Sequence, residues 1–382
     1  MFNRMFMILF DLSNDLLKYL LKIFLKKPSK PIPSIRRSLL WGNKVAIATV
    51  EDYNKDTIKE NLSNMFDSIG GLENIINSNS KVAIKINLTA GFGDPDDDRS
   101  IRHWVEDKGI SATEAFWTHP AVIQAVCELI IEIGVHDLNI CEALWDHESL
   151  NDYRSIMDEL DIPFIDLNDN HCLKHFLNWR AYHYKIIKLH KMLKEIDVFI
   201  SISKMKCHRS VGVTHTMKNL IGITPFQDYT NNYINRDKFH RDSNKEMAYH
   251  LPKSIVDINL ARPITLSVID GIKTIDGGEG PWWNNVVPIE PHVLITGTNA
   301  VATDAVAMDV QGFNPMAGDF QEPFNNSCNY LALAKDKGLG TNNLEDIQIY
   351  GESIEDVTTQ FHTPPYDPNC FIMLPGRNIN FP

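Results

Sequence analysis

The chain has few cysteines, and their spacing does not suit a metal cluster. Its six cysteines are scattered over 382 residues, and no two of them form a C-x-x-C pair. Ferredoxin-type iron–sulphur clusters need closely spaced cysteine thiolates, so we expect no self-contained iron–sulphur cluster. Scattered cysteines in a long chain are typical of reduced thiols packed in a core. The cofactor, if there is one, stays unknown at this point.

A net positive charge is also missing. The chain has 37 Lys and Arg residues against 49 Asp and Glu residues, which gives a formal net charge of -12. A general nucleic-acid binder needs a basic face that displaces counterions from the phosphates. We therefore expect no nucleic-acid partner, although a local basic pocket for a small anion is compatible with this charge.

An uninterrupted apolar run long enough to span a membrane is absent from the N-terminal region. Residues 1–25 are rich in Phe, Leu, Met and Ile, but charged residues recur among them every three or four positions: Asp11, Asp15, Lys18, Lys22 and Lys26. Such spacing predicts an amphipathic helix over residues 1–27, and charges of this number argue against a spanning helix. The helix either lies on a membrane surface or packs against the protein or a partner. We expect a cytoplasmic protein, peripheral to the membrane if residues 1–27 meet one.

The body of the chain alternates short β-branched runs with amphipathic helical stretches, after a Pro-rich linker over residues 28–43. This alternation predicts an α/β fold with a largely parallel sheet and helices on both faces. We expect two lobes, 44–230 and 251–382, separated by a polar excursion or lid over residues 231–250. The expected strands are Val45–Val50, Val82–Leu88, Leu138–Cys141, Val198–Ser203, Ile264–Ile269 and Val293–Thr296, and the clearest expected helices are Thr57–Ile69, His119–Ile133, Ala300–Val310 and Asn329–Lys337.

Charged side chains follow five of these strands. In open parallel sheets, ligands bind outside the carboxyl ends of the strands, so we expect the five groups to meet at one rim. Lys85 lies in an apolar strand, where a buried ammonium needs a partner or a bound anion. The groups are Lys85 with Asn87, Glu142, the segment 203–225, Asp270 with Gly271, and Asp304.

The segment 203–225 is the densest of the five. Its lysines, hydroxyl and amide groups near a helix N-terminus suit a phosphate or a carboxylate, and His208 has the chemistry of a general acid or base. His208 and His215 could together bind a metal, but no third ligand stands at a firm spacing, so we predict no metal site. Cys207 is expected to be a packed thiol rather than a nucleophile. The candidate ligand and catalytic residues in this segment are Lys206, His208, Thr214, Lys218 and Asn219.

Asp304 stands near the apolar face of its expected helix. A buried aspartate needs a cation or several hydrogen-bond donors. The site lysines are the candidate partners, and an interaction with the helix dipole is the alternative. A Gly-rich loop, Asp276–Pro281, has backbone amides that could approach an anion, although its pattern matches no nucleotide motif and also fits a simple turn.

Five blocks of the sequence resemble the family called domain of unknown function 362. They are KINL, THPAVIQAV, the segment 204–225, DGIKTIDGGEGP and GTNAVATDAVAMDVQGFNP, and the resemblance runs from about Lys44 to Gly351. It implies an α/β fold and a polar site. The positions that it implies for this site are Lys85, Asn87, Glu142, Lys206, His208, Lys218, Asn219, Asp270 and Asp304. His215 and Cys207 stand where other residues are expected. Many members carry or accompany ferredoxin modules, so redox chemistry here implies electrons from a separate electron-transfer partner.

We therefore expect an enzyme that binds a small anionic metabolite or cofactor, with Lys85, Lys206 and Lys218 holding the anion. In this interpretation His208 moves a proton, while Asp304 and Glu142 orient the lysines. Two alternatives from other classes stay open: a carrier that holds an anionic cofactor without converting it, and a membrane-associated assembly factor that uses residues 1–27.

Overall fold

The structure is a computed structural model, and it describes residues 42–169, 171–225, 244–283 and 286–365. The expected N-terminal helix, most of the Pro-rich linker and residues 231–243 of the expected lid lie outside these ranges. Residues 244–250 of that lid form the start of helix α13.

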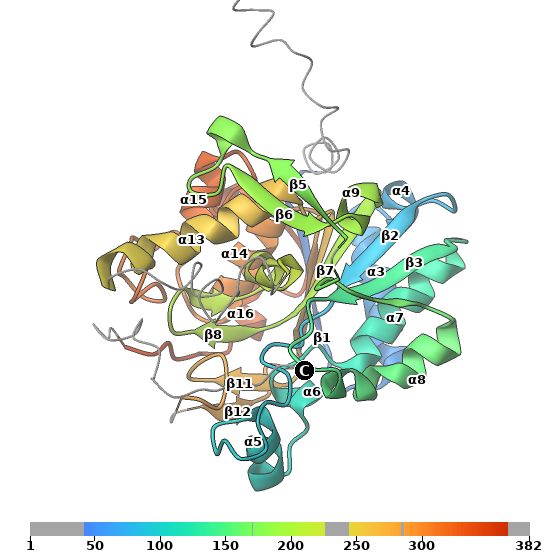
Figure 1. Ribbon diagram of the computed structural model, residues 1–382, viewed down its shortest axis with the longest axis horizontal. Helices are drawn as coiled ribbons and strands as arrows, with labels where there is room; N and C mark the ends of the chain where they lie inside the picture. The colour runs from blue at the N-terminus through green and yellow to red at the C-terminus, as the bar shows by residue number, and fades with distance from the viewer. Residues whose placement is uncertain (1–41, 170, 226–243, 284–285, 366–382) are drawn as a thin grey trace, which may run out of the picture.

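The described residues form an eight-stranded mixed sheet between two layers of helices (Figure 1). Its order is β14-β1-β13-β10-β7-β2-β3-β4. The expected α/β class with a mostly parallel sheet is confirmed, since only β13 runs against its neighbours. The strands are β1 (Lys44–Thr49), β2 (Lys81–Lys85), β3 (Asp137–Glu142), β4 (Phe164–Asp166), β7 (Val198–Lys204), β10 (Leu266–Gly271), β13 (Val293–Gly297) and β14 (Gln348–Gly351).

Alternate residues of the central strands bury against opposite layers, because successive side chains of a strand point to opposite faces. Val82 and Ile84 of β2 pack with helices α3 and α7, whereas Ala83 packs in the other core. The helices of the first layer include α3 (Lys55–Ser68), α7 (Pro120–Glu132) and α8 (Asn151–Leu160). Those of the second include α13 (Asn244–Ala261), α14 (Ala300–Val310) and α15 (Tyr330–Asp336).

Local sequence signals explain where these helices begin. The Asn54 and Asn299 side chains accept hydrogen bonds from Thr57 N and Ala302 N at the first turns of α3 and α14. Such side-chain caps satisfy backbone donors that have no partner inside the helix. Helix α7 has Pro120 in its first turn, a position where the missing N–H of proline costs nothing.

Short elements complete the described part of the chain. The helices are α4 (Leu72–Ile75), α5 (Ile101–Lys108), α6 (Ala112–Ala115), α9 (Met192–Glu195), α10 (Thr216–Asn219) and α16 (Ile354–Val357). The strand pairs are β5 (Cys172–Phe176) with β6 (Ile186–His190), β8 (Lys206–His208) with β9 (Gly212–Thr214), and β11 (Thr274–Asp276) with β12 (Val287–Ile289). No helix within the described ranges is long and apolar enough to cross a membrane.

The direction of β13 corrects one expectation about the rim. The chain leaves β10 and returns through the β11–β12 hairpin, so Val293 at the start of β13 pairs with Gly271 at the end of β10. The chain re-enters the sheet at the same end at which β10 leaves it, so the two neighbouring strands run antiparallel. The carboxyl end of β13 therefore lies at the opposite edge, and four of the five expected strand ends share one rim.

The two expected lobes share the sheet. Strands β1, β2, β3, β4 and β7 precede the expected boundary, and β10, β13 and β14 follow it, yet all eight are hydrogen-bonded into one sheet. The division into lobes stays a prediction.

Candidate functional site

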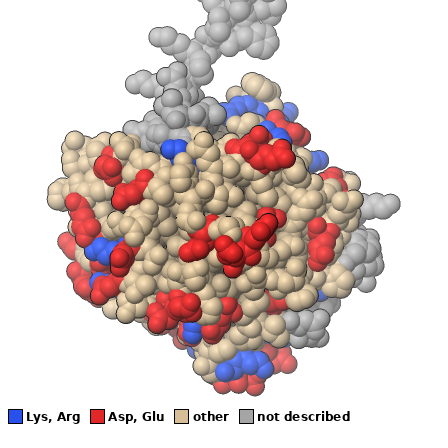
Figure 2. Space-filling model, turned by 180° about the vertical axis from the view of Figure 1, so that it is seen from behind, with Lys and Arg blue, Asp and Glu red and all other residues tan. Residues whose placement is uncertain are grey.

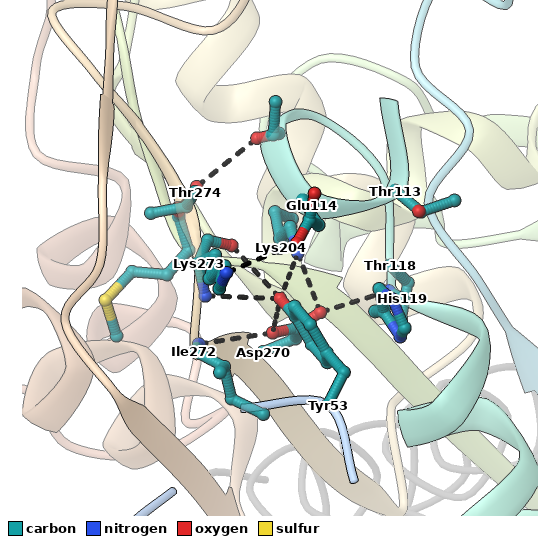
Figure 3. A network of polar contacts seen from close by, with 12 residues as sticks. Tyr53, Thr113, Glu114, Thr118, His119, Lys204, Asp270, Ile272, Lys273 and Thr274 are labelled. Carbon is teal, nitrogen blue, oxygen red and sulfur yellow. Dashed lines mark hydrogen bonds and ion pairs between the residues drawn. The ribbon is translucent and has the colours of Figure 1, made fainter. Parts of the chain in front are cut away.

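Lys204 and Asp270 form a buried ion pair at the ends of the adjacent parallel strands β7 and β10 (Figure 3). Both side chains are fully buried, and Lys204 Nζ lies 2.9 Å from Asp270 Oδ2. Tyr53 closes the group, because its hydroxyl donates to Asp270 Oδ1 at 3.0 Å and accepts from Lys204 Nζ at 2.8 Å. His119 N also donates to Asp270, at 3.0 Å. Asp270 thus has its partners within the protein.

His119 lies flat on Tyr53, with ring centroids 3.5 Å apart. Burial, together with the positive charge of Lys204, lowers the pKa of His119 to about 4. Burial also lowers the pKa of Lys204, while Asp270 opposes that shift. At neutral pH the imidazole of His119 is therefore uncharged, and it is a hydrogen-bonding and stacking group rather than a cation.

Lys85 has a complete set of partners at the end of β2. Its ammonium donates to Ile86 O at 2.6 Å, to Glu142 Oε2 at 2.7 Å and to Asn219 Oδ1 at 3.2 Å. An ammonium has three N–H donors, so this geometry uses all of them. Glu142 also accepts from the backbone amides of Leu88 and Ala143. Lys85, Glu142 and Asn219 lie together as predicted. Their hydrogen bonds are made within the protein, and the ammonium of Lys85 has no N–H left to donate to an anion.

Gly222 is part of this arrangement. A Cβ atom added there would lie 2.2 Å from Glu142 Oε1 and 2.8 Å from Lys85 Nζ, at distances that real Cβ atoms do not adopt. The glycine that closes the K-N-x-x-G block therefore leaves room for the ion pair.

Lys206 differs from the other two buried lysines. Its side chain is fully buried, but among the described residues its Nζ donates only to Phe116 O, at 2.8 Å. Asn87 Nδ2 donates to the same carbonyl at 3.1 Å. Within the described ranges no carboxylate lies within ion-pair distance of Lys206. Burial lowers the pKa of Lys206 to about 7, and the charges of Lys204 and Lys218 act in the same direction, whereas Glu279 opposes them.

A polar group with unused hydrogen-bonding capacity lies beside Lys206. Thr214 stands directly opposite it in the β8–β9 ladder, so the two side chains share one face. The hydroxyl of Thr214 is buried and has no hydrogen-bond partner in the described part of the chain, and the same holds for Ser203 at the end of β7. Buried polar groups normally have partners. Four side chains of the site each keep 5–8% of their surface exposed, so each of them borders solvent: Asn87, His208, Thr214 and Asn219.

His208 faces a glutamate from the Gly-rich loop. Its Nδ1 accepts from Ser210 N at 3.1 Å and lies 4.0 Å from Glu279 Oε2. Burial alone would raise the pKa of Glu279, but His208, when it is protonated, and hydrogen bonds from Arg209 N and two tryptophan indoles lower it to about 2. Trp282 and Trp283 donate these bonds at 3.1 and 2.7 Å. The loop thus places a carboxylate beside His208.

Asp304 does not pair with the lysines, and the expectation that they are its direct partners is wrong. Its carboxylate accepts from Thr216 N and Met217 N, both at 3.0 Å, and from the Thr216 hydroxyl. These donors belong to the first turn of α10, whose N–H groups have no partners inside the helix. Burial raises the pKa of Asp304 to about 7 despite these hydrogen bonds. Asp304 therefore fixes the position of α10, and through it that of Lys218 and Asn219.

His215 and Cys207 are packed side chains. His215 Nε2 lies 2.8 Å from Gln311 Oε1, and burial lowers the pKa of His215 to about 4. Cys207 is buried, and burial raises the pKa of its thiol well above the usual value. Gly271, the last residue of β10, contacts Val293 and Met205, where a Cβ would lie 2.9 and 3.1 Å away. Gly271 thus serves close packing in this structure.

Another polar group lies away from these residues. Ligand atoms of Asp169, His171 and His190 all lie within 4.8 Å of one another. Asp169 Oδ1 and His171 Nδ1 are already hydrogen-bonded at 2.6 Å, and both side chains are exposed. This contact accounts for their closeness without an ion, and the predicted absence of a metal site stays a prediction.

Three members of the site escaped sequence reasoning: Tyr53, His119 and Glu279. Tyr53 follows β1, which runs parallel to β10 and ends at the same rim. His119 belongs to the block THPAVIQAV and directly precedes α7. The position of Tyr53 shortly after an expected strand is a signal that the sequence does contain. In contrast, nothing in the sequence indicates that Phe116 O accepts the hydrogen bond of Lys206.

Comparisons with known proteins bear on the family of this chain. The chain is 23% identical over 275 residues to "Thylakoid-associated protein sll1697" from Synechocystis sp., which covers 71% of this chain and 75% of that protein. It also resembles a crystal structure of a Thermotoga maritima protein at 13% identity and a TM-score of 0.39, covering 76% of this chain. The chain spans 60% of that solved chain, and a TM-score this low supports no structural argument. The model of the family described as Domain of unknown function (DUF362) matches residues 104–309, more than half of the chain. The chain therefore belongs to the DUF362 family.

Proposed function

We propose that the protein binds a small phosphate- or carboxylate-bearing molecule at Lys206, in a site that Asn87, Thr214 and Lys218 complete. The observation that carries this proposal is the contrast among three buried lysines. Lys85 and Lys204 are paired with buried carboxylates, whereas in the described part of the chain the hydrogen-bond partner of Lys206 is one carbonyl oxygen. A buried ammonium without a carboxylate is costly, and a bound anion would remove that cost.

The neighbours of Lys206 suit this role. The hydroxyl of Thr214 can donate to an anionic oxygen. Lys218 adds a positive charge, which contributes to lowering the pKa of Lys206. Hydrogen bonds in which one partner is charged are shorter and stronger than neutral ones. The site would therefore hold an anion through two ammonium groups and a hydroxyl group.

An enzymatic reaction is the form of this function that we favour. His208 lies beside Glu279, whose carboxylate stays charged, so the imidazole is placed to exchange a proton with a bound molecule. If the reaction is redox, the electrons come from a separate partner, because the cysteine spacing does not suit a cluster. The same geometry would serve a carrier of an anionic cofactor, in which His208 only contacts the ligand.

Sulfate is the probe that tests anion binding, because it stays a dianion across the relevant pH range. In the protein without ligand, Lys206 loses its proton as the pH rises through about 7. A bound anion favours the charged amine, so binding above this pH requires proton uptake. We expect an association constant that is constant below about pH 7 and falls by up to about tenfold per pH unit above it.

Isothermal titration of the full chain with sodium sulfate between pH 6 and pH 9, at constant ionic strength, measures this profile. Buffers of different ionisation enthalpy would show the proton uptake directly. Affinity that does not change with pH, or the absence of saturable binding, would contradict a site centred on Lys206.

A peripheral membrane location is a second proposal. The name of the Synechocystis relative describes that protein as thylakoid-associated, and we propose that this chain also associates with a membrane surface. The segment expected to make that contact, residues 1–27, lies outside the described residues.

A further inference from the structure

The β5–β6 hairpin presents large apolar side chains to solvent. The exposed fractions are 63% for Phe176, 86% for Trp179, 45% for Ile186 and 41% for Leu173. Phe176, Trp179 and Ile186 are three of the nine exposed large apolar side chains among the described residues, and they lie within 11 positions of one another. Clustered exposed apolar side chains mark an interaction surface, whereas single ones are ordinary.

The two faces of the hairpin differ. Ile187 and Leu189 are fully buried in the main core, so one face packs on the protein. On the other face, Phe176 stands opposite Ile186, and Lys174 stands opposite Lys188. Like charges directly opposite each other on paired strands are destabilising. An anionic surface against this face would remove the repulsion.

The charge of the hairpin is opposite to that of the whole chain. Positions 172–190, which make up the hairpin, hold four Lys or Arg residues and no Asp or Glu, in a chain whose net charge is -12. Three of the four are exposed: Lys174, Lys185 and Lys188. In contrast, the face seen in Figure 2 carries several groups of Asp and Glu. The hairpin is therefore a basic and apolar surface on an acidic protein.

The connection between β5 and β6 is held firmly. The Asp257 carboxylate of α13 accepts hydrogen bonds from the backbone amides of Tyr182, His183 and Tyr184, each at 2.7 Å. The ammonium of Lys337 lies 4.0 Å from the centre of the Tyr182 ring. These contacts fix the connection between β5 and β6, so Trp179 and Phe176 project from an ordered support.

We propose that the β5–β6 hairpin docks on an anionic membrane surface, with Phe176, Trp179 and Ile186 entering the headgroup region and the lysines contacting lipid phosphates. Tryptophan is enriched at the level of lipid headgroups, and basic residues beside apolar ones are typical of interfacial binding. A second copy of the chain would bring an equally basic hairpin, so charge disfavours that occupant. This inference rests on the proposed peripheral location and names the surface that serves it.

Vesicle co-sedimentation of the full chain tests the proposal. We expect binding to vesicles of phosphatidylcholine and phosphatidylglycerol in equal amounts, and much weaker binding to pure phosphatidylcholine. Each lysine near an anionic surface contributes about fivefold in affinity, so the double variant Lys174→Glu with Lys185→Glu should bind at least about twentyfold more weakly. Trp179→Ser should lower the affinity about tenfold, because it removes the most exposed apolar side chain.

Matched controls lie at the other end of the molecule, on α5 and β12 at the bottom of Figure 1. Lys108→Glu reverses an exposed charge, and Val287→Ser removes an apolar side chain that is 52% exposed. Both should bind vesicles like the wild type. If the wild-type chain binds and the hairpin variants bind equally well, the hairpin is not the docking surface, while the peripheral location stands. If the wild-type chain does not bind, both proposals fail, and an acidic protein partner becomes the better occupant.

Hydrogen exchange of the wild-type chain avoids any effect of the substitutions on folding. With anionic vesicles present, the backbone amides of residues 173–186 should exchange more slowly, while those of α5 should not change. Protection that spares the hairpin would overturn the proposal.

Discussion

Replacing Lys85 by methionine is expected to lower the free energy of unfolding by about 3–5 kcal/mol. The substitution leaves Glu142 buried without its cation, with Asn219 and Ile86 O also losing a donor. A carboxylate buried in this way either keeps an uncompensated charge or takes up a proton, and both outcomes cost stability. Equilibrium unfolding of the full chain in urea measures the change.

The double variant Lys85→Met with Glu142→Leu is the control for this prediction. Removing both charges leaves no unpaired carboxylate, so the double variant should regain part of the stability that the single variant loses. A loss below about 1 kcal/mol in the single variant would show that the pair is not a fixed structural contact. Lys85 would then again be a candidate ligand-binding lysine.

Replacing Lys206 by methionine is expected to have the opposite consequences. The variant should keep its free energy of unfolding within about 1 kcal/mol of the wild type or gain stability, because an ammonium without a carboxylate is replaced by an apolar side chain of similar length. Phe116 O keeps a donor in Asn87 Nδ2. Sulfate affinity should fall at least about thirtyfold, since the charged group that contacts the anion is lost. Urea unfolding and sulfate titration on the same preparation measure both quantities.

Lys204→Met is the matched control for this second prediction. It removes a lysine two positions away, but one that is bonded to Asp270 and Tyr53. We expect a loss of stability comparable to that of Lys85→Met. If Lys206→Met is the destabilising variant of the two, or if it binds sulfate normally, Lys206 is a structural lysine.

Much of the fold follows from local sequence patterns. The β-branched runs mark strands that are buried on both faces, and the side chains of Asn54 and Asn299 mark helix starts by their capping chemistry. The direction of β13 does not follow, because the residues VLITG carry no information on strand direction. That direction is set by the short return through β11 and β12, which places the start of β13 beside the end of β10.

The residues of the site are partly predictable, but their roles are not. Lys85, Lys204 and Lys206 all follow or end buried strands, and sequence alone gives them the same chemistry. Their partners come from positions 57, 66 and 90 residues away, so the tertiary fold decides which lysine is satisfied. Asp304 shows the same limit, because its partners are the backbone amides of a helix 87 and 88 residues earlier.

A crystal of the full chain soaked in sodium selenate would show whether an anion binds beside Lys206. Selenate has the shape and charge of sulfate, and its selenium atom gives an anomalous signal that locates the ion. We predict an anomalous peak for a selenate whose oxygens lie about 3 Å from Lys206 Nζ, with Lys85 and Lys204 still bonded to Glu142 and Asp270. Selenate bound elsewhere on the protein, with no peak beside Lys206, would contradict this prediction.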